Sequence, residues 1–142
     1  MNYKKDFGTK ASAIITEAFV FPSFRQGELP SLKYYTPFAA WDTGADHTSI
    51  SSEVIEALQL KPKNYTTIMV FGGEQKVGVY DVAIALPNGK LFHEMEVYGA
   101  DLGEYSILFG MDIITETDFL ITNSDGKTTF QFRTPSEGGV EL

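Results

Sequence analysis

The sequence contains no cysteine, which excludes disulfide bonds, zinc–thiolate sites and a cysteine nucleophile. Histidine is also scarce, because His47 and His93 are the only two in the chain. So few imidazole groups argue against a histidine-rich metal site. We therefore expect neither a metal nor any other cofactor.

Positive charge is scarce as well. The chain has 11 lysines and arginines against 19 aspartates and glutamates, which gives a formal net charge of −8. Nucleic-acid-binding surfaces need a basic stripe, so we expect no nucleic-acid partner. No glycine-rich loop ends in Gly-Lys-Ser or Gly-Lys-Thr, which argues against a phosphate-dependent enzyme.

Long apolar runs are missing too, since none approaches the ~20 residues that a membrane-spanning helix needs. The N-terminal stretch begins with two lysines and then turns apolar, like a secretory signal. However, Asp6, Thr16 and Glu17 interrupt it, and no typical cleavage site follows. We expect a cytoplasmic protein without a membrane partner.

The remaining composition is that of an ordinary folded domain, with 43% hydrophobic and 21% charged residues. A length of 142 residues is enough for one domain with its own hydrophobic core. We predict a single domain over residues 1–142, with loose ends at 1–9 and 134–142.

Short segments rich in β-branched and aromatic residues, bounded by Gly, Pro, Asn and Asp, predict strands joined by turns. The predicted strands cover residues 10–21, 32–41, 64–71, 75–86, 91–99, 105–110, 120–123 and 128–133. Together they predict an all-β fold, built as a small closed or half-closed β-barrel.

One or two short helices should interrupt these strands. A clear helix is predicted over residues 51–60, where Ser51 can act as the N-cap. The residues expected on its shared face are Val54, Ala57 and Leu58. A second, shorter helix is predicted within residues 111–119, with Asp112 as its N-cap.

The segment most suggestive of chemistry is the strand that runs through Trp41 into Asp42-Thr43-Gly44-Ala45. Because this strand is apolar on both faces, Asp42 should lie inside the molecule or at an interface. A buried carboxylate is costly unless it is paired or functional. An ordinary turn would also account for Asp and Gly at this position.

Three segments together resemble the retropepsin-like aspartic proteases, in the order typical of that family. They are residues 40–45 (AWDTGA), 71–73 (FGG) and 108–110 (LFG), within a resemblance that spans about residues 10–133. The resemblance implies a retropepsin (acid protease) type of barrel and an aspartic endopeptidase, which is a hydrolase.

In that family two carboxylates share one proton, because two negative charges ~3 Å apart cannot both form. One carboxylate activates a water and the other donates to the scissile carbonyl. This chain has a single Asp-Thr-Gly, so the resemblance implies a symmetric homodimer with Asp42 as the catalytic residue of each chain. The alternative is a catalytically silent module that uses the same fold to bind peptides or proteins.

The resemblance also implies roles for the rest of this motif. Thr43 would hydrogen-bond across the dimer axis, and Gly44 would let the substrate backbone approach closely. Ala45 stands where two-domain pepsin-like enzymes usually carry a hydroxyl that lowers the pKa of the catalytic aspartate. We therefore predict activity at mildly acidic to near-neutral pH.

The substrate would be a peptide or protein segment in extended conformation, held between a flap and the groove floor. The residues that would bind it are Ala45, Asp46, His47, Phe71, Gly72, Gly73, Ile107 and Leu108. Each has a plainer reading. His47 could belong to a polar loop, residues 71–73 could form an ordinary hairpin turn, and Ile107 and Leu108 could be core.

Two departures from the retroviral pattern bear on the site. Retroviral members carry an arginine after the glycine that ends the third of these segments, where it pairs with the acid that follows Asp-Thr-Gly-Ala. This chain has Met111 there, which leaves Arg133 or Arg25 as candidate partners for Asp46. Retroviral dimers also interleave their chain ends, and the strand over residues 128–133 is a candidate for pairing across the dimer.

Overall fold

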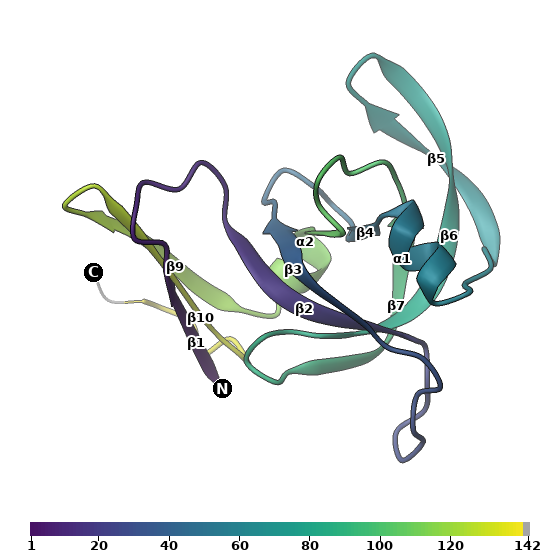
Figure 1. Ribbon diagram of the computed structural model, residues 1–142, viewed down its shortest axis with the longest axis horizontal. Helices are drawn as coiled ribbons and strands as arrows, with labels where there is room; N and C mark the ends of the chain where they lie inside the picture. The colour runs from purple at the N-terminus through teal and green to yellow at the C-terminus, as the bar shows by residue number, and fades with distance from the viewer. Residues whose placement is uncertain (141–142) are drawn as a thin grey trace.

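The computed structural model describes residues 1–140, and most of its regular secondary structure is β-strand (Figure 1). Within these residues a three-stranded sheet has the order β1-β10-β9 and a seven-stranded sheet the order β2-β3-β8-β4-β7-β6-β5. The strands are β1 (Asn2–Asp6), β2 (Ile15–Pro22), β3 (Tyr34–Trp41), β4 (Ser49–Ile50), β5 (Asn64–Val70), β6 (Gly73–Ala85), β7 (Leu91–Gly99), β8 (Ile107–Phe109), β9 (Asp118–Ser124) and β10 (Lys127–Arg133). The helices are α1 (Ser52–Ala57) and α2 (Met111–Ile114).

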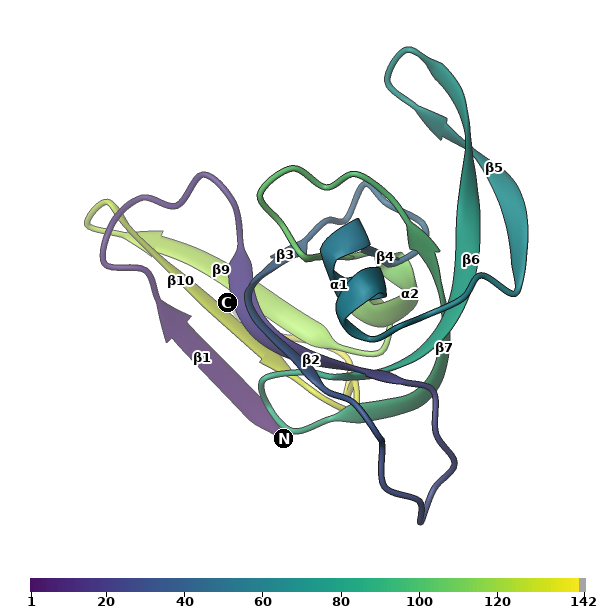
Figure 2. The ribbon, with the colours of Figure 1, turned by 45° about the vertical axis from the view of Figure 1, so that its right-hand side comes forward.

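The larger sheet curls into a ring because β2 pairs on both of its edges. One edge of β2 meets β3, and the other meets β6 from Phe19↔Ala85 to Pro22↔Val82. The predicted all-β class with short helices is confirmed, although the ring is not a clean barrel. Before Val79, residues 73–78 of β6 pair only with β5, and the two strands form a hairpin that stands away from the ring (Figure 1 and Figure 2).

The core fills the ring with side chains from both sheets and both helices. Its fully enclosed members include Val20, Ile50, Val54, Ile84, Ile107, Phe109, Ile113 and Phe130. Burial of this much apolar surface is the main favourable term in folding. Trp41, at the end of β3, joins the two sheets, since its ring lies 4.9 Å from Phe109 in β8 and 5.2 Å from Phe130 in β10, centroid to centroid.

The chain ends are more ordered than the sequence indicates. Residues 1–9 are not a loose end, because β1 pairs with β10 from Asn2↔Arg133 to Asp6↔Thr129. Residues 134–140 form no helix or strand, but Ser136, Glu137 and Gly138 donate hydrogen bonds to the Asp118 carboxylate. The last part of the predicted C-terminal loose end, residues 141–142, lies outside the described residues.

Strand β10, which contains residues 128–133, cannot pair across a dimer, contrary to the possibility that the sequence raised. One edge of β10 is occupied by β1 and the other by β9, so its ladder positions are filled within the chain. A strand with two filled edges has no unpaired backbone groups for a further strand. The unpaired edges of this terminal sheet are the outer edges of β1 and β9.

The predicted helix over residues 51–60 is shorter in the structure. Ser51 is the N-cap of α1 and accepts from Val54 N, but the helix ends at Ala57. Gln59 takes a left-handed φ of 53°, which a continuing right-handed helix does not allow. Val54 and Leu58 are buried, whereas Ala57 is exposed and does not share their environment.

Candidate active site

The Asp42 turn lies at the point where the chain crosses the end of a short central strand. Strand β3 runs parallel to β8 on one side, with Trp41↔Phe109 as their last pair. After residues 42–48 the chain returns as β4 on the other side of β8, with Ser49↔Leu108. The Asp42 loop, residues 42–48, therefore bridges both neighbours of β8.

Asp42 continues the ladder of β3 for one more hydrogen bond before the chain turns. Its N–H donates to Phe109 O at 2.9 Å. Its carboxylate Oδ1 accepts from Gly44 N at 2.8 Å, and its carbonyl accepts from Ala45 N at 3.3 Å. The turn holds the Asp42 side chain half-buried, with Thr43 and Gly44 exposed beside it.

The far end of the loop is anchored by Thr48, which the sequence did not single out. Thr48 is fully buried, and its N–H and Oγ1 donate to the two oxygens of the Asp112 carboxylate at 2.9 and 2.7 Å. The same Oγ1 accepts from Gly110 N at 3.2 Å. A charge-assisted pair of this kind is stronger than neutral hydrogen bonds, so it holds the loop against α2.

Asp112 is not the N-cap of the second helix, contrary to the sequence prediction. The N-cap is Gly110, in an extended conformation, and Asp112 lies within the first turn of α2. Its carboxylate is already committed to Thr48 and to Ile113 N. Because the partners are 64 residues apart, no local sequence pattern reveals the contact.

Backbone contacts add to this anchor. Met111 N donates to Ala45 O at 2.7 Å and Asp112 N donates to Asp46 O at 3.3 Å. At Gly110 an added Cβ would lie 2.7 Å from the carbonyl carbon and oxygen of His47. Only glycine allows so close a backbone approach, which accounts for the glycine at the end of the segment 108–110.

Neither candidate arginine pairs with Asp46. Arg133 binds Asp118 at 3.0 Å and lies in β10. Among residues 1–140, no ion pair includes Asp46 or Arg25. The Asp46 side chain is exposed.

A groove of about 470 Å³ separates the Asp42 loop from β5. It is lined by Gly44, Ala45, Asp46, His47, Ser49, Thr67, Ile68, Met69 and Tyr98. The predicted residues Ala45, Asp46 and His47 thus lie in one groove, and the His47 ring packs 4.8 Å from that of Tyr98. The sequence did not identify Tyr98 or the β5 residues that line the groove, because nothing in it indicates which strand lies opposite the Asp42 loop.

The predicted flap residues lie at the tip of the β5–β6 hairpin and do not line this groove. Val70 pairs with Gly73, so Phe71 and Gly72 form the turn, and Gly72 and Gly73 have φ values of 102° and 137°. Such values favour glycine. Phe71 is fully exposed and Met69 is 75% exposed, which is unusual for large apolar side chains outside a binding surface.

Ile107 is core rather than a pocket wall, which corrects its predicted role in substrate binding. Its side chain is fully buried together with Phe109, on the inner face of β8. Leu108 alternates to the opposite face and is half-buried. Directly paired residues share a face, so Leu108 lies on the same face as Ser49, which lines the groove.

No family model matches the sequence, and no curated protein matches it either. Solved structures do match. The EIAV protease complexed with the inhibitor HBY-793 is similar at a TM-score of 0.51 and 21% identity, over 72% of this chain and 86% of that one. A retropepsin-like aspartic protease from Rickettsia conorii is similar at a TM-score of 0.51 and 13% identity, over 92% of both chains. The chain has a retropepsin-like fold.

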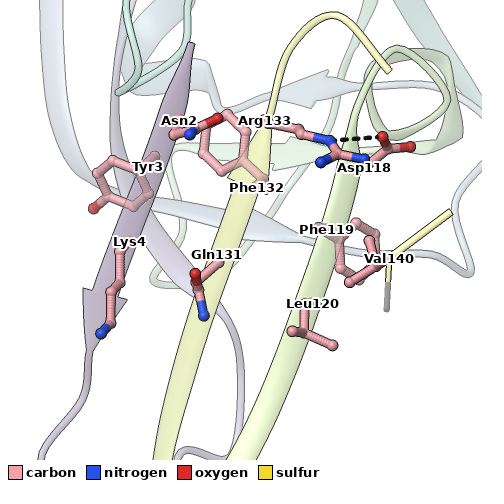
Figure 3. Close-up of a pocket in the computed structure, with 10 residues that line it drawn as sticks. All are labelled: Asn2, Tyr3, Lys4, Asp118, Phe119, Leu120, Gln131, Phe132, Arg133 and Val140. Atoms are coloured by element: carbon pink, nitrogen blue, oxygen red, sulfur yellow. Dashed lines mark hydrogen bonds and ion pairs between the residues drawn. The ribbon is translucent and has the colours of Figure 1, made fainter. Parts of the chain in front are cut away.

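The described part of this retropepsin-like fold also has hollows away from the Asp42 loop. One, of about 580 Å³, lies between α1, β6 and the loop that follows β7. Another, of about 340 Å³, lies on the terminal sheet, around the Arg133–Asp118 pair (Figure 3). Neither hollow is lined by residues of the Asp42 loop.

Residues 1–140 are the part of the chain that the structure describes. That part of the chain holds no cluster of His, Cys, Asp or Glu that could bind a metal ion. It also holds no helix with the length and apolarity needed to cross a membrane.

Proposed function

We propose that the protein is a homodimeric aspartic endopeptidase in which each chain supplies one catalytic Asp42. The observation that carries this proposal is the half-buried Asp42 carboxylate on a turn anchored at both ends, in a chain with a retropepsin-like fold. A surface turn needs no anchor of this kind, whereas a catalytic group must be held within a few tenths of an ångström.

The proposed chemistry uses two Asp42 carboxylates that share one proton. The ionised carboxylate takes a proton from a water, whose oxygen bonds to the scissile carbonyl carbon. The protonated carboxylate gives its proton to the carbonyl oxygen, which forms a tetrahedral diol. Proton transfer to the amide nitrogen then breaks the carbon–nitrogen bond and releases an acid and an amine.

The homodimer is part of this proposal because one chain holds a single Asp-Thr-Gly. A two-fold axis beside Asp42 would bring the second carboxylate to the same water. Thr43 is exposed in the single chain, which is consistent with a side chain that would hydrogen-bond across such an axis.

The substrate would be an extended peptide that adds as a strand between the Asp42 loop and the β5–β6 hairpin. The exposed Met69 and Phe71 would close over it and exclude water. Asp46 and His47 would border the peptide, and Leu108 would contact its side chains.

The test is cleavage of a mixed peptide library, read by mass spectrometry from pH 3 to 8. Wild type should cleave and Asp42→Asn should not. Asp125→Asn is the matched control, because it makes the same change in the Asp-Gly turn between β9 and β10. It should cleave like wild type. With Ala45 beside the active carboxylate, the optimum should lie above about pH 3.

Equal cleavage by wild type and Asp42→Asn would show a contaminant and reject Asp42 as the catalyst. No cleavage by wild type, at a concentration where a dimer is demonstrated, would reject the enzyme in favour of a peptide-binding module. A pH optimum below about 3 would contradict the role assigned to Ala45.

A further inference from the structure

The terminal sheet lies directly against the strand that carries Asp42. The Trp41 ring, one residue before Asp42, lies 5.2 Å from the Phe130 ring and 5.0 Å from the Phe132 ring, both in β10. Because these aromatic rings are closely packed, they fix the position of the terminal sheet relative to the end of β3. Any second chain that joins the terminal sheet is therefore held at a defined position relative to Asp42.

The sheet offers two unpaired edges, and the β1 edge is poorly suited to a second copy. Lys4 and Lys5 are adjacent near the middle of β1, and Lys5 Nζ also donates to Ile15 O of the same chain at 2.7 Å. Two copies of β1 paired about a two-fold axis would bring these lysines against their own mates. Like charges opposite one another destabilise a pair of strands, and lysines protect exposed edges.

The β9 edge is charged only at its first residue, Asp118, which is paired with Arg133 of the same chain. Residues Leu120, Ile121, Thr122 and Asn123 are neutral, and Ile121 is 41% exposed. Antiparallel pairing of β9 with its own copy is two-fold symmetric. An axis through Ile121 sets Asp118 opposite Ser124, and an axis through Thr122 sets it opposite Gly126, so neither register brings two carboxylates directly together. The edge is also apolar enough to gain from burial.

Within the described residues, the C-terminal tail covers only the beginning of this edge. Glu137 N and Gly138 N donate to Asp118 Oδ2 at 2.7 and 3.1 Å, at the first residue of β9. Val140 lines the same hollow as Phe119 and lies beside it in Figure 3. Within the described residues, the backbone of residues 121–124 forms hydrogen bonds only with β10.

We propose that a second copy of this chain binds along the outer edge of β9, antiparallel to it, about a two-fold axis near Ile121 and Thr122. This contact joins the two three-stranded sheets into one continuous sheet. It differs from interleaved chain ends, because each chain keeps β1 and β10 in its own sheet. The inference rests on the proposed dimeric protease, in which the site is incomplete without the partner.

The natural absence of cysteine allows a clean cross-linking test. Only the residue on the two-fold axis faces its own copy, so Ile121→Cys or Thr122→Cys, whichever lies on the axis, should form a reducible dimer of twice the protomer mass under mild oxidation. Lys4→Cys, also exposed but on the β1 edge, is the matched control and should remain monomeric on a denaturing gel. Circular dichroism checks that each variant keeps the fold.

Charged substitutions at Ile121 give an independent test of the β9 contact. Ile121→Lys and Ile121→Glu, each alone, should weaken dimerisation about tenfold or more, because like charges meet across the axis. An equimolar mixture should restore the dimer and, with it, peptide cleavage. Sedimentation velocity over a concentration series measures the first effect without reference to activity.

The outcomes separate the interface from the enzyme. A wild-type dimer with no cross-link at residue 121 or 122 and no effect of the charge variants overturns the β9 contact and leaves a dimeric protease possible. A cross-linked dimer that cleaves nothing supports the contact and rejects the protease. A wild type that cleaves peptides as a monomer overturns both.

Discussion

Replacing Thr48 by valine should destabilise the protein more than a single hydrogen bond would indicate. Valine keeps the shape of the side chain but removes the Oγ1 bond to the Asp112 carboxylate and the acceptor for Gly110 N. A hydrogen bond to a charged group contributes about 1.5–3 kcal/mol, and an unsatisfied buried donor costs about 1–3 kcal/mol. Asp112 keeps its bonds from Thr48 N and Ile113 N, so we expect a total loss of about 2–4 kcal/mol.

The assay is urea unfolding at one protomer concentration, because a dimer makes stability depend on concentration. Thr48→Ser keeps the hydroxyl and should lose only about 1 kcal/mol, for the missing methyl group. Thr117→Val is the matched control, since its buried hydroxyl donates only to the neutral Ile114 O, worth about 1 kcal/mol. A Thr48→Val loss no larger than that of Thr117→Val would refute the anchoring of the Asp42 loop by Asp112.

Two further substitutions test the close approach at Gly110 and the hydrogen bonds of the Asp118 carboxylate. Gly110→Ala should cost about 1–3 kcal/mol in urea unfolding and reduce peptide cleavage, because its Cβ would meet the His47 backbone at 2.7 Å; an unchanged urea midpoint would contradict this close approach. Hydrogen bonds from Ser136, the Glu137 N–H and Arg133 lower the pKa of Asp118 from 3.8 to about 2. The stability that this carboxylate adds is therefore complete above about pH 4 and is lost as the pH falls toward 2. Thermal melting should show Asp118→Asn less stable than wild type at pH 6, with a gap that closes over that range, and a gap independent of pH would exclude this titration.

Elements defined by local patterns could be predicted from the sequence. The Ser51 cap, the apolar strand before Asp42 and the hairpin at Gly72-Gly73 each depend on residues close together in the chain. Capping, strand propensity and left-handed glycines act over a few residues, so a single sequence reveals them.

The elements that were missed depend on distant partners. Strand β1 has a polar sequence, NYKKD, and forms because Tyr3 packs on Phe132 at 5.3 Å between ring centroids and its backbone pairs with β10. Strand β4 has only two residues, which is too short for any periodicity. Tertiary pairing therefore decides strands that intrinsic propensity does not.

The candidate site divides in the same way. The residues of the Asp42 turn and three groove residues could be named from a motif and a resemblance. Ile107 was misassigned because alternation along a three-residue strand cannot show which face is core. Thr48 was missed because its importance comes from Asp112, in a different part of the chain.

The anchor of the Asp42 loop requires no positive charge, which explains how the chain tolerates Met111 in place of the arginine of the retroviral pattern. In that pattern the arginine pairs with the acid after Asp-Thr-Gly-Ala. Here Met111 contributes its backbone N–H to Ala45 O, and the Asp112 carboxylate holds Thr48 from the next position. The Asp46 carboxylate is therefore not needed to hold the loop against α2, and it lies exposed at the groove.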